Sequence, residues 1–171
     1  MTAALLVVTA CTIALGGVLA VDRLRDRRQI SAAPTVGSTV SSTAVVGTDT
    51  DGRPLAVELV ARTLIVFLSS SCMTCRGLWA EFRGDLARRL PPGTEVVIVT
   101  EDQDDERPAV VRDLAPRRIP VVMSTPTWRR LGVTAAPFFV LVEGGSGRVL
   151  AADTAPDGDA VIRLVQPPNT V

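Results

Sequence analysis

Two cysteines, Cys72 and Cys75, have the residue type and the spacing that could do redox chemistry. Cysteines at positions i and i+3 lie on one face of a helix, with Cβ atoms roughly 5–6 Å apart. Two cysteines at that separation can close a disulfide after a small adjustment. The pair comes directly after an apolar run at 63–68, and a proline, Pro137, stands at the start of a later apolar run. A dithiol at a strand-to-helix junction is typical of a thiol–disulfide redox site.

The expected place of Cys72 at the start of a helix favours a reactive thiolate. Unpaired N–H groups and the helix dipole stabilise negative charge there, and Arg76 adds a positive charge nearby. We expect the thiolate of Cys72 to attack a disulfide sulfur and Cys75, one turn deeper, to resolve the mixed disulfide. The alternative is a structural disulfide or a pair of inert thiols.

The composition excludes several other kinds of site. The chain has 171 residues, no histidine, and 18 basic residues, all arginine, against 18 acidic ones. Without histidine or lysine there is no Ser-His-Asp triad, no histidine-ligated metal and no Schiff base, and three cysteines cannot form a four-thiolate zinc site. The serines at 69–71 lack a base to activate them. We therefore expect no metal and no cofactor, and a net charge of zero gives no reason to expect nucleic acid as a partner.

The first part of the chain predicts a membrane anchor. Residues 3–21 form a stretch of nineteen residues without charge, followed by four arginines within 22–28. Nineteen helical residues match a hydrocarbon core about 30 Å thick. We therefore assign 1–28 to a transmembrane anchor with its basic flank, 29–43 to a flexible linker, and 44–171 to the folded domain. A cleaved signal peptide and a lipoprotein signal ending at Cys11 are the alternatives.

Within the folded domain, apolar runs alternate with amphipathic segments. Leucine and phenylalanine recur every four residues through 78–90, which indicates a helix, and the uninterrupted run at 63–68 indicates a strand covered on both faces. We expect strands over 44–47, 55–60, 63–68, 95–100, 119–123, 138–142 and 148–152, and helices over 73–90, 107–114, 125–131 and 157–165. Thr125 is expected to be the N-cap of the third helix. This alternation predicts an α/β fold with a central sheet.

Two segments carry a resemblance to a known family. Residues 67–75, FLSSSCMTC, resemble the strand and active-site start of thioredoxin-fold proteins, and residues 131–140, LGVTAAPFFV, resemble the segment that carries their cis-proline. The extra strand and helix that begin at Ile119 resemble the TlpA-like branch. That branch includes the MauD proteins and neighbours the alkyl hydroperoxide reductase/thiol-specific antioxidant group. The resemblance covers about residues 50–165.

The resemblance implies a thioredoxin-like fold, with a central mixed sheet flanked by helices and preceded by one transmembrane helix. It implies an enzyme, a thiol–disulfide oxidoreductase that reduces or exchanges disulfides in partner proteins through Cys72 and Cys75. It also implies a cis peptide bond between Ala136 and Pro137, where the partner's chain would bind. Members of this branch commonly carry an N-terminal anchor, so the resemblance implies a single-pass protein of the cell membrane with its domain outside the cytoplasm.

The departures from the family pattern leave other readings open. Ser71 stands where a large side chain commonly precedes the first cysteine, Val66 where many thioredoxins have a buried acid, and Ala136 where a β-branched residue is common. The Met-Thr pair between the cysteines does not indicate the direction of electron flow. One alternative is a tethered, non-catalytic maturation adaptor with a permanent disulfide. A second is a peroxiredoxin-like peroxidase, of whose loop only the hydroxyl of Ser69 is present.

Overall fold

The computed structural model describes residues 32–166. Its strands are β1 (Ala44–Thr48), β2 (Pro54–Glu58), β3 (Arg62–Phe67), β4 (Thr94–Thr100), β5 (Val121–Met123), β6 (Phe138–Val142) and β7 (Val149–Asp153). Its helices are α2 (Met73–Arg83), α3 (Leu86–Arg89), α4 (Pro108–Leu114), α5 (Thr125–Arg130) and α6 (Gly158–Val165). The expected alternation of strands and helices is confirmed.

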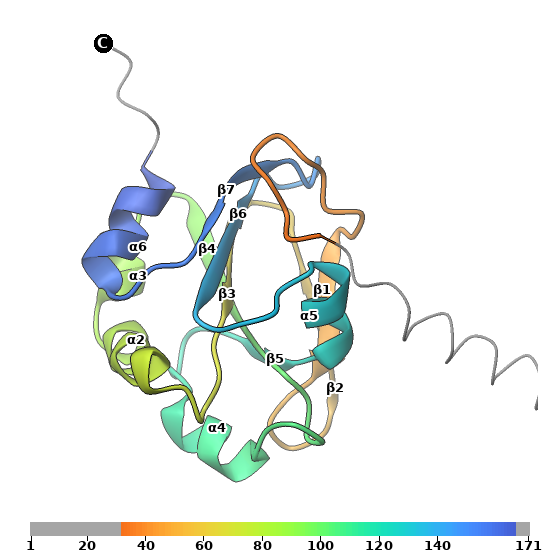
Figure 1. The fold of residues 1–171 in the computed structure, drawn as a ribbon, viewed down its shortest axis with the longest axis vertical. Coiled ribbons are helices and arrows are strands. Elements are labelled where there is room, and N and C mark those ends of the chain that lie inside the picture. Colours follow the sequence, from red (N-terminus) through yellow and green to blue (C-terminus); the bar gives the residue numbers. More distant parts are fainter. Residues whose placement is uncertain (1–31, 167–171) are drawn as a thin grey trace, which may run out of the picture. The chain divides into compact units, whose positions relative to one another are not determined.

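The seven strands form one mixed sheet in the order β2-β1-β5-β4-β3-β6-β7 (Figure 1). Strands β3, β4 and β5 are parallel to one another. Strand β6 pairs antiparallel with β3 and with β7, and the β1–β2 hairpin joins β5 antiparallel at the other side. The expected mixed central sheet flanked by helices is therefore confirmed for residues 32–166.

Strand β3 is covered on both faces, as its uninterrupted apolar run predicts. Leu64 and Val66 pack into a core beneath α2, α3, α4 and α6. Ile65 and Phe67 pack into a second core with α5 and the β1 side of the sheet. Helix α5 lies on the opposite face from α2 and α6 (Figure 1). The ring of Trp128 meets Phe67 edge-on at a centroid distance of 5.3 Å, so this tryptophan belongs to the core.

Two helix boundaries differ from those predicted. The helix expected over 73–90 is interrupted at Gly84, whose N–H donates to the carbonyl of Ala80, before α3 begins at Leu86. Glycine weakens helix propagation, and apolar spacing alone does not reveal such a break. The N-cap of α5 is Ser124 and not Thr125, because the Ser124 hydroxyl accepts the N–H of Thr127 at 3.3 Å.

The segment before β1 packs on the end of the β6–β7 hairpin. The N–H groups of Gly37 and Val40 donate to the carbonyls of Val149 and Gly147, each at 2.9 Å. The last part of the predicted linker thus lies against the folded domain, and the domain boundaries stay a prediction. None of the helices within 32–166 has the length and apolarity needed to cross a membrane. The span predicted at 3–21 lies outside these residues.

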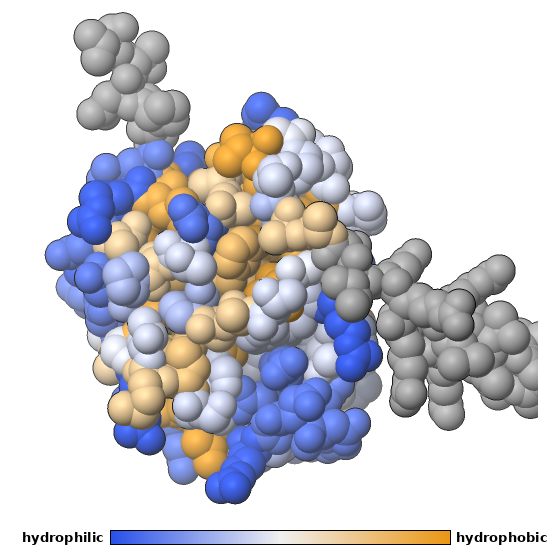
Figure 2. All heavy atoms as spheres, in the orientation of Figure 1, coloured by the Kyte–Doolittle hydropathy of each residue, from blue (hydrophilic) through white to orange (hydrophobic). Residues whose placement is uncertain are grey.

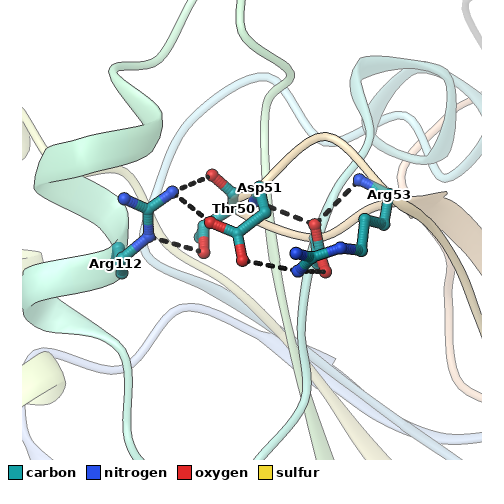
Figure 3. Close-up of polar contacts among 5 residues, drawn as sticks. Thr50, Asp51, Arg53 and Arg112 are labelled. Atoms are coloured by element: carbon teal, nitrogen blue, oxygen red, sulfur yellow. Dashed lines mark hydrogen bonds and ion pairs between the residues drawn. The ribbon is translucent and has the colours of Figure 1, made fainter.

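Helix α4 is fastened to the β1–β2 turn by an arginine (Figure 3). The guanidinium of Arg112 donates to the carbonyl of Thr50 at 2.6 Å and also contacts the carboxylate of Asp51. Asp51 in turn accepts from Arg53 at 2.7 Å. These groups are exposed, so the ion pairs contribute little free energy. They place the last turn of α4 beside the β1–β2 turn.

Two glycines provide a matched test of how closely β1 packs against β5. A Cβ on Gly47 would lie 2.3 Å from the carbonyl oxygen of Met123, whereas a Cβ on Gly77 would meet nothing within 4 Å. We predict that Gly47→Ala lowers the free energy of unfolding by roughly 2 kcal/mol, because β1 must move away from β5. Gly77→Ala in α2 should raise it by about 0.5–1 kcal/mol. Urea unfolding of both variants measures the two changes, and equal effects would contradict the β1–β5 contact.

Candidate active site

The two cysteines of the predicted site are joined in the structure. Cys72 and Cys75 form a disulfide with their Cα atoms 5.2 Å apart. Cys72 is the N-cap of α2, and its Sγ accepts the N–H of Cys75 at 3.2 Å. The predicted junction of strand and helix is therefore confirmed, and the sulfur of Cys72 lies where the helix N-terminus favours negative charge.

The two sulfurs differ in their exposure. Cys72 is half-buried, and Cys75 is fully buried in the core beneath α2. A reagent or partner coming from solvent therefore meets Cys72 first. Arg76 follows on the exposed side of the same helix turn. This arrangement allows an outer sulfur to exchange and an inner sulfur to close the ring.

The proline segment lies beside the outer cysteine. The peptide bond between Ala136 and Pro137 is cis, which confirms the expectation from the sequence. The carbonyl oxygen of Ala136 lies 3.6 Å from Sγ of Cys72. Ala136 and Pro137 are both half-buried, so their main chain is within reach of a molecule bound at the disulfide. The fold thus brings together residues that are 64 positions apart.

The loop between β3 and α2 is held by hydrogen bonds from several directions. The indole N–H of Trp79 in α2 donates to the carbonyl of Ser69 at 3.4 Å. The N–H of Ser71 donates to the Ser69 hydroxyl at 3.2 Å. Trp79 is fully buried and belongs to the core, with its N–H holding the loop. The orientation of Cys72 therefore depends on these serines.

Sequence reasoning missed one residue of the site, Glu106. Its carboxylate accepts the N–H of Ser70 at 2.9 Å and also the Ser70 hydroxyl. Glu106 is only 5% exposed and is the one buried charged residue within 32–166. Five of the six residues at 101–106 are acidic, which is typical of a solvated connection. Nothing in that local pattern distinguishes the residue that turns inward.

The connection that carries Glu106 is itself acidic. Figure 2 shows a hydrophilic area where the β4–α4 connection and the β1–β2 turn lie in Figure 1. Partial burial, followed by the negative charges of Asp105, Glu106 and Asp102, raises the pKa of Glu101. The acidic residues thus repel one another, and a further negative charge placed here meets the same repulsion.

Comparisons with solved structures identify the fold. The pneumococcal exposed lipoprotein thioredoxin Etrx1 from Streptococcus pneumoniae aligns over 71% of this chain and 97% of its own at 14% identity, with a TM-score of 0.57. The thioredoxin domain of thiol-disulfide oxidoreductase BVU-2223 from Bacteroides vulgatus aligns over 78% and 100% at 15% identity, with a TM-score of 0.53. A peroxiredoxin-like protein from Aquifex aeolicus aligns over 80% and 88% at 16% identity, with a TM-score of 0.58.

These similarities establish a thioredoxin-like fold for the domain. No protein-family model matches the chain, and no curated protein matches it significantly. At 14–16% identity the shared architecture establishes the fold but not the activity, which depends on the residues of the site.

Proposed function

We propose that this protein is a membrane-anchored thiol–disulfide oxidoreductase that reduces or exchanges disulfides in partner proteins. The observation that carries the proposal is the unequal burial of Cys72 and Cys75 at the start of α2, with Ala136 beside the outer sulfur. The names of two similar structures, a thioredoxin and a thiol-disulfide oxidoreductase, support the same chemistry.

In the reducing direction, the reaction begins with both cysteines as thiols. The thiolate of Cys72 attacks one sulfur of the partner's disulfide, forming a mixed disulfide and releasing the partner's other sulfur as a thiolate. The N–H of Cys75, which donates to Sγ of Cys72, stabilises the attacking thiolate.

Cys75 completes the exchange from inside the core. Its thiolate attacks Sγ of Cys72, the mixed disulfide breaks, and the partner's second sulfur leaves as a thiolate. The partner gains two electrons and two protons, and the protein is left with the Cys72–Cys75 disulfide seen in the structure. The reverse sequence of steps oxidises a partner dithiol.

Ala136 and Pro137 are the proposed docking point for the partner's chain. The main chain of Ala136 runs past the outer sulfur at 3.6 Å, and both residues remain partly exposed. A strand of the partner that passes this edge would bring its disulfide to Cys72. The thioredoxin resemblance implies this role for the backbone edge at the cis-proline, Pro137.

Anchoring by residues 3–21 is the remaining part of the proposal. The four arginines after this stretch favour a cytoplasmic domain by the positive-inside rule. The family resemblance favours an extracytoplasmic domain, in an oxidising compartment where disulfides persist. We choose the outside, because tethering a dithiol exchanger is most useful where diffusible thiol buffers are absent.

Single cysteine substitutions should separate the two proposed roles. We predict that Cys72→Ser abolishes disulfide exchange, because the accessible nucleophile is lost. Cys75→Ser should still attack but accumulate mixed disulfides, because no second thiol resolves them. Non-reducing gels and mass spectrometry of trapped adducts measure both results. Adducts on Cys75 in the Cys72→Ser variant, together with no adducts on Cys72 in the Cys75→Ser variant, would reverse the assignment.

A thiol-labelling experiment in intact cells tests the membrane topology. We predict that a membrane-impermeant thiol reagent labels Cys72 without lysis after mild reduction, because the domain faces outward. A Cys11→Ala variant removes the cysteine of the predicted span from the readout. Labelling that occurs only after lysis would contradict the outside location and indicate a domain facing the cytoplasm.

A further inference from the structure

Both carboxylate oxygens of Glu106 accept hydrogen bonds from one residue of the loop before the dithiol. One oxygen accepts the Ser70 N–H at 2.9 Å, and the other accepts the Ser70 hydroxyl. Ser70 lies two residues before Cys72 and donates to the carboxylate at 2.9 Å, so the carboxylate oxygen is at most about 12 Å from the Cα atom of that cysteine. Glu106 comes from 36 residues further on, on the β4–α4 connection.

The backbone that carries Glu106 is itself fixed. Its N–H donates to the carbonyl of Asp102 at 2.8 Å, and the N–H of Asp102 donates to the Thr125 hydroxyl at 3.0 Å. Thr125 is the first residue of α5. Directly after Glu106, α4 is held to the β1–β2 turn by Arg112. The main chain of Glu106 is thus tied through Asp102 to the start of α5, and its contact with Ser70 joins this connection to the dithiol loop.

The charge of Glu106 has no counter-ion within 32–166. The ion pairs of that region involve other acids and leave this carboxylate with hydrogen bonds alone. Burying an unpaired carboxylate is costly. A glutamine could make equivalent contacts, since its oxygen can accept the N–H and its NH₂ can donate to the hydroxyl oxygen. Holding the loop therefore does not by itself require a charge.

From these contacts we propose that Glu106 is a positioning residue for the dithiol: it holds Ser70 in place, and its negative charge opposes the thiolate of Cys72. The second effect counters the helix N-terminus and Arg76, which favour the thiolate. The neighbouring acids Asp102 and Asp105 carry the same sign of charge, but their carboxylates accept from the Asp104 N–H and the Thr125 hydroxyl and not from the dithiol loop. The inference rests on the proposed function for its purpose, because a thiol that never exchanges needs no such adjustment.

The charge effect can be measured without any partner protein. The full-length protein is reduced with an excess of a phosphine, and the alkylation rate of Cys72 by iodoacetamide is followed against pH by peptide mass spectrometry. We expect Glu106→Gln to lower the pKa of the Cys72 thiol by roughly one pH unit, as a charge at this distance implies. Ser70→Ala, which keeps the charge, should leave that pKa unchanged.

Asp104 provides the matched control. It lies on the same connection, is exposed, and makes its contacts away from Ser70. We expect Asp104→Asn to leave the pKa of the Cys72 thiol where it is in the parent protein. An unchanged or raised pKa in Glu106→Gln, or an equal fall in Asp104→Asn, would overturn the specific role of the Glu106 charge.

The positioning effect has a separate readout. We expect Glu106→Ala, which removes the contacts, to slow closure of the Cys72–Cys75 disulfide by oxidised glutathione by about tenfold. Glu106→Gln should close at nearly the parent rate when the variants are compared at a pH at which Cys72 is ionised in all of them, because it restores the contacts and the thiolate fractions are then equal. Closure in Glu106→Ala as fast as in the parent would overturn the positioning role. If the parent exchanges with no partner while these shifts are seen, the proposed function fails and the inference about Glu106 stands.

Discussion

The reactivity of the outer sulfur depends on where the first turn of α2 is held. Cys72 accepts the N–H of Cys75 as the N-cap of this helix, so the sulfur lies at the positive end of the helix dipole. That position is set by β3, which is buried on both faces and ends just before the loop. The fixed strand, the loop and the helix start together decide where the disulfide is presented.

Three segments distant in sequence meet at this point. The α5–β6 connection brings the carbonyl of Ala136 to 3.6 Å from Sγ of Cys72. The β4–α4 connection brings Glu106 onto the loop through Ser70. In the parallel part of the sheet, β3 and β4 end on the same side, which is why their connections can touch. The topology therefore brings the main-chain edge at Ala136 and the carboxylate of Glu106 to the same dithiol loop.

Local spacing predicted the parts of the site that depend on local geometry. The Cys72–Cys75 pair and the buried strand before it follow from neighbouring residues, whereas the cis bond before Pro137 was expected from the family resemblance alone. Glu106 was missed because its contact depends on the register of β3 against β4, and the acids beside it have the same composition. The break at Gly84 was missed for a similar reason, since the apolar spacing continues across it.

The reduction potential of the Cys72–Cys75 pair tests the central claim most directly. It is measured by equilibrating the full-length protein with defined ratios of reduced and oxidised dithiothreitol or glutathione and quantifying the two forms. Exchange with partner proteins predicts a potential between about −270 and −120 mV, the range of known dithiol exchangers. A value well below about −300 mV, typical of structural disulfides, would contradict the account and indicate a permanent clasp.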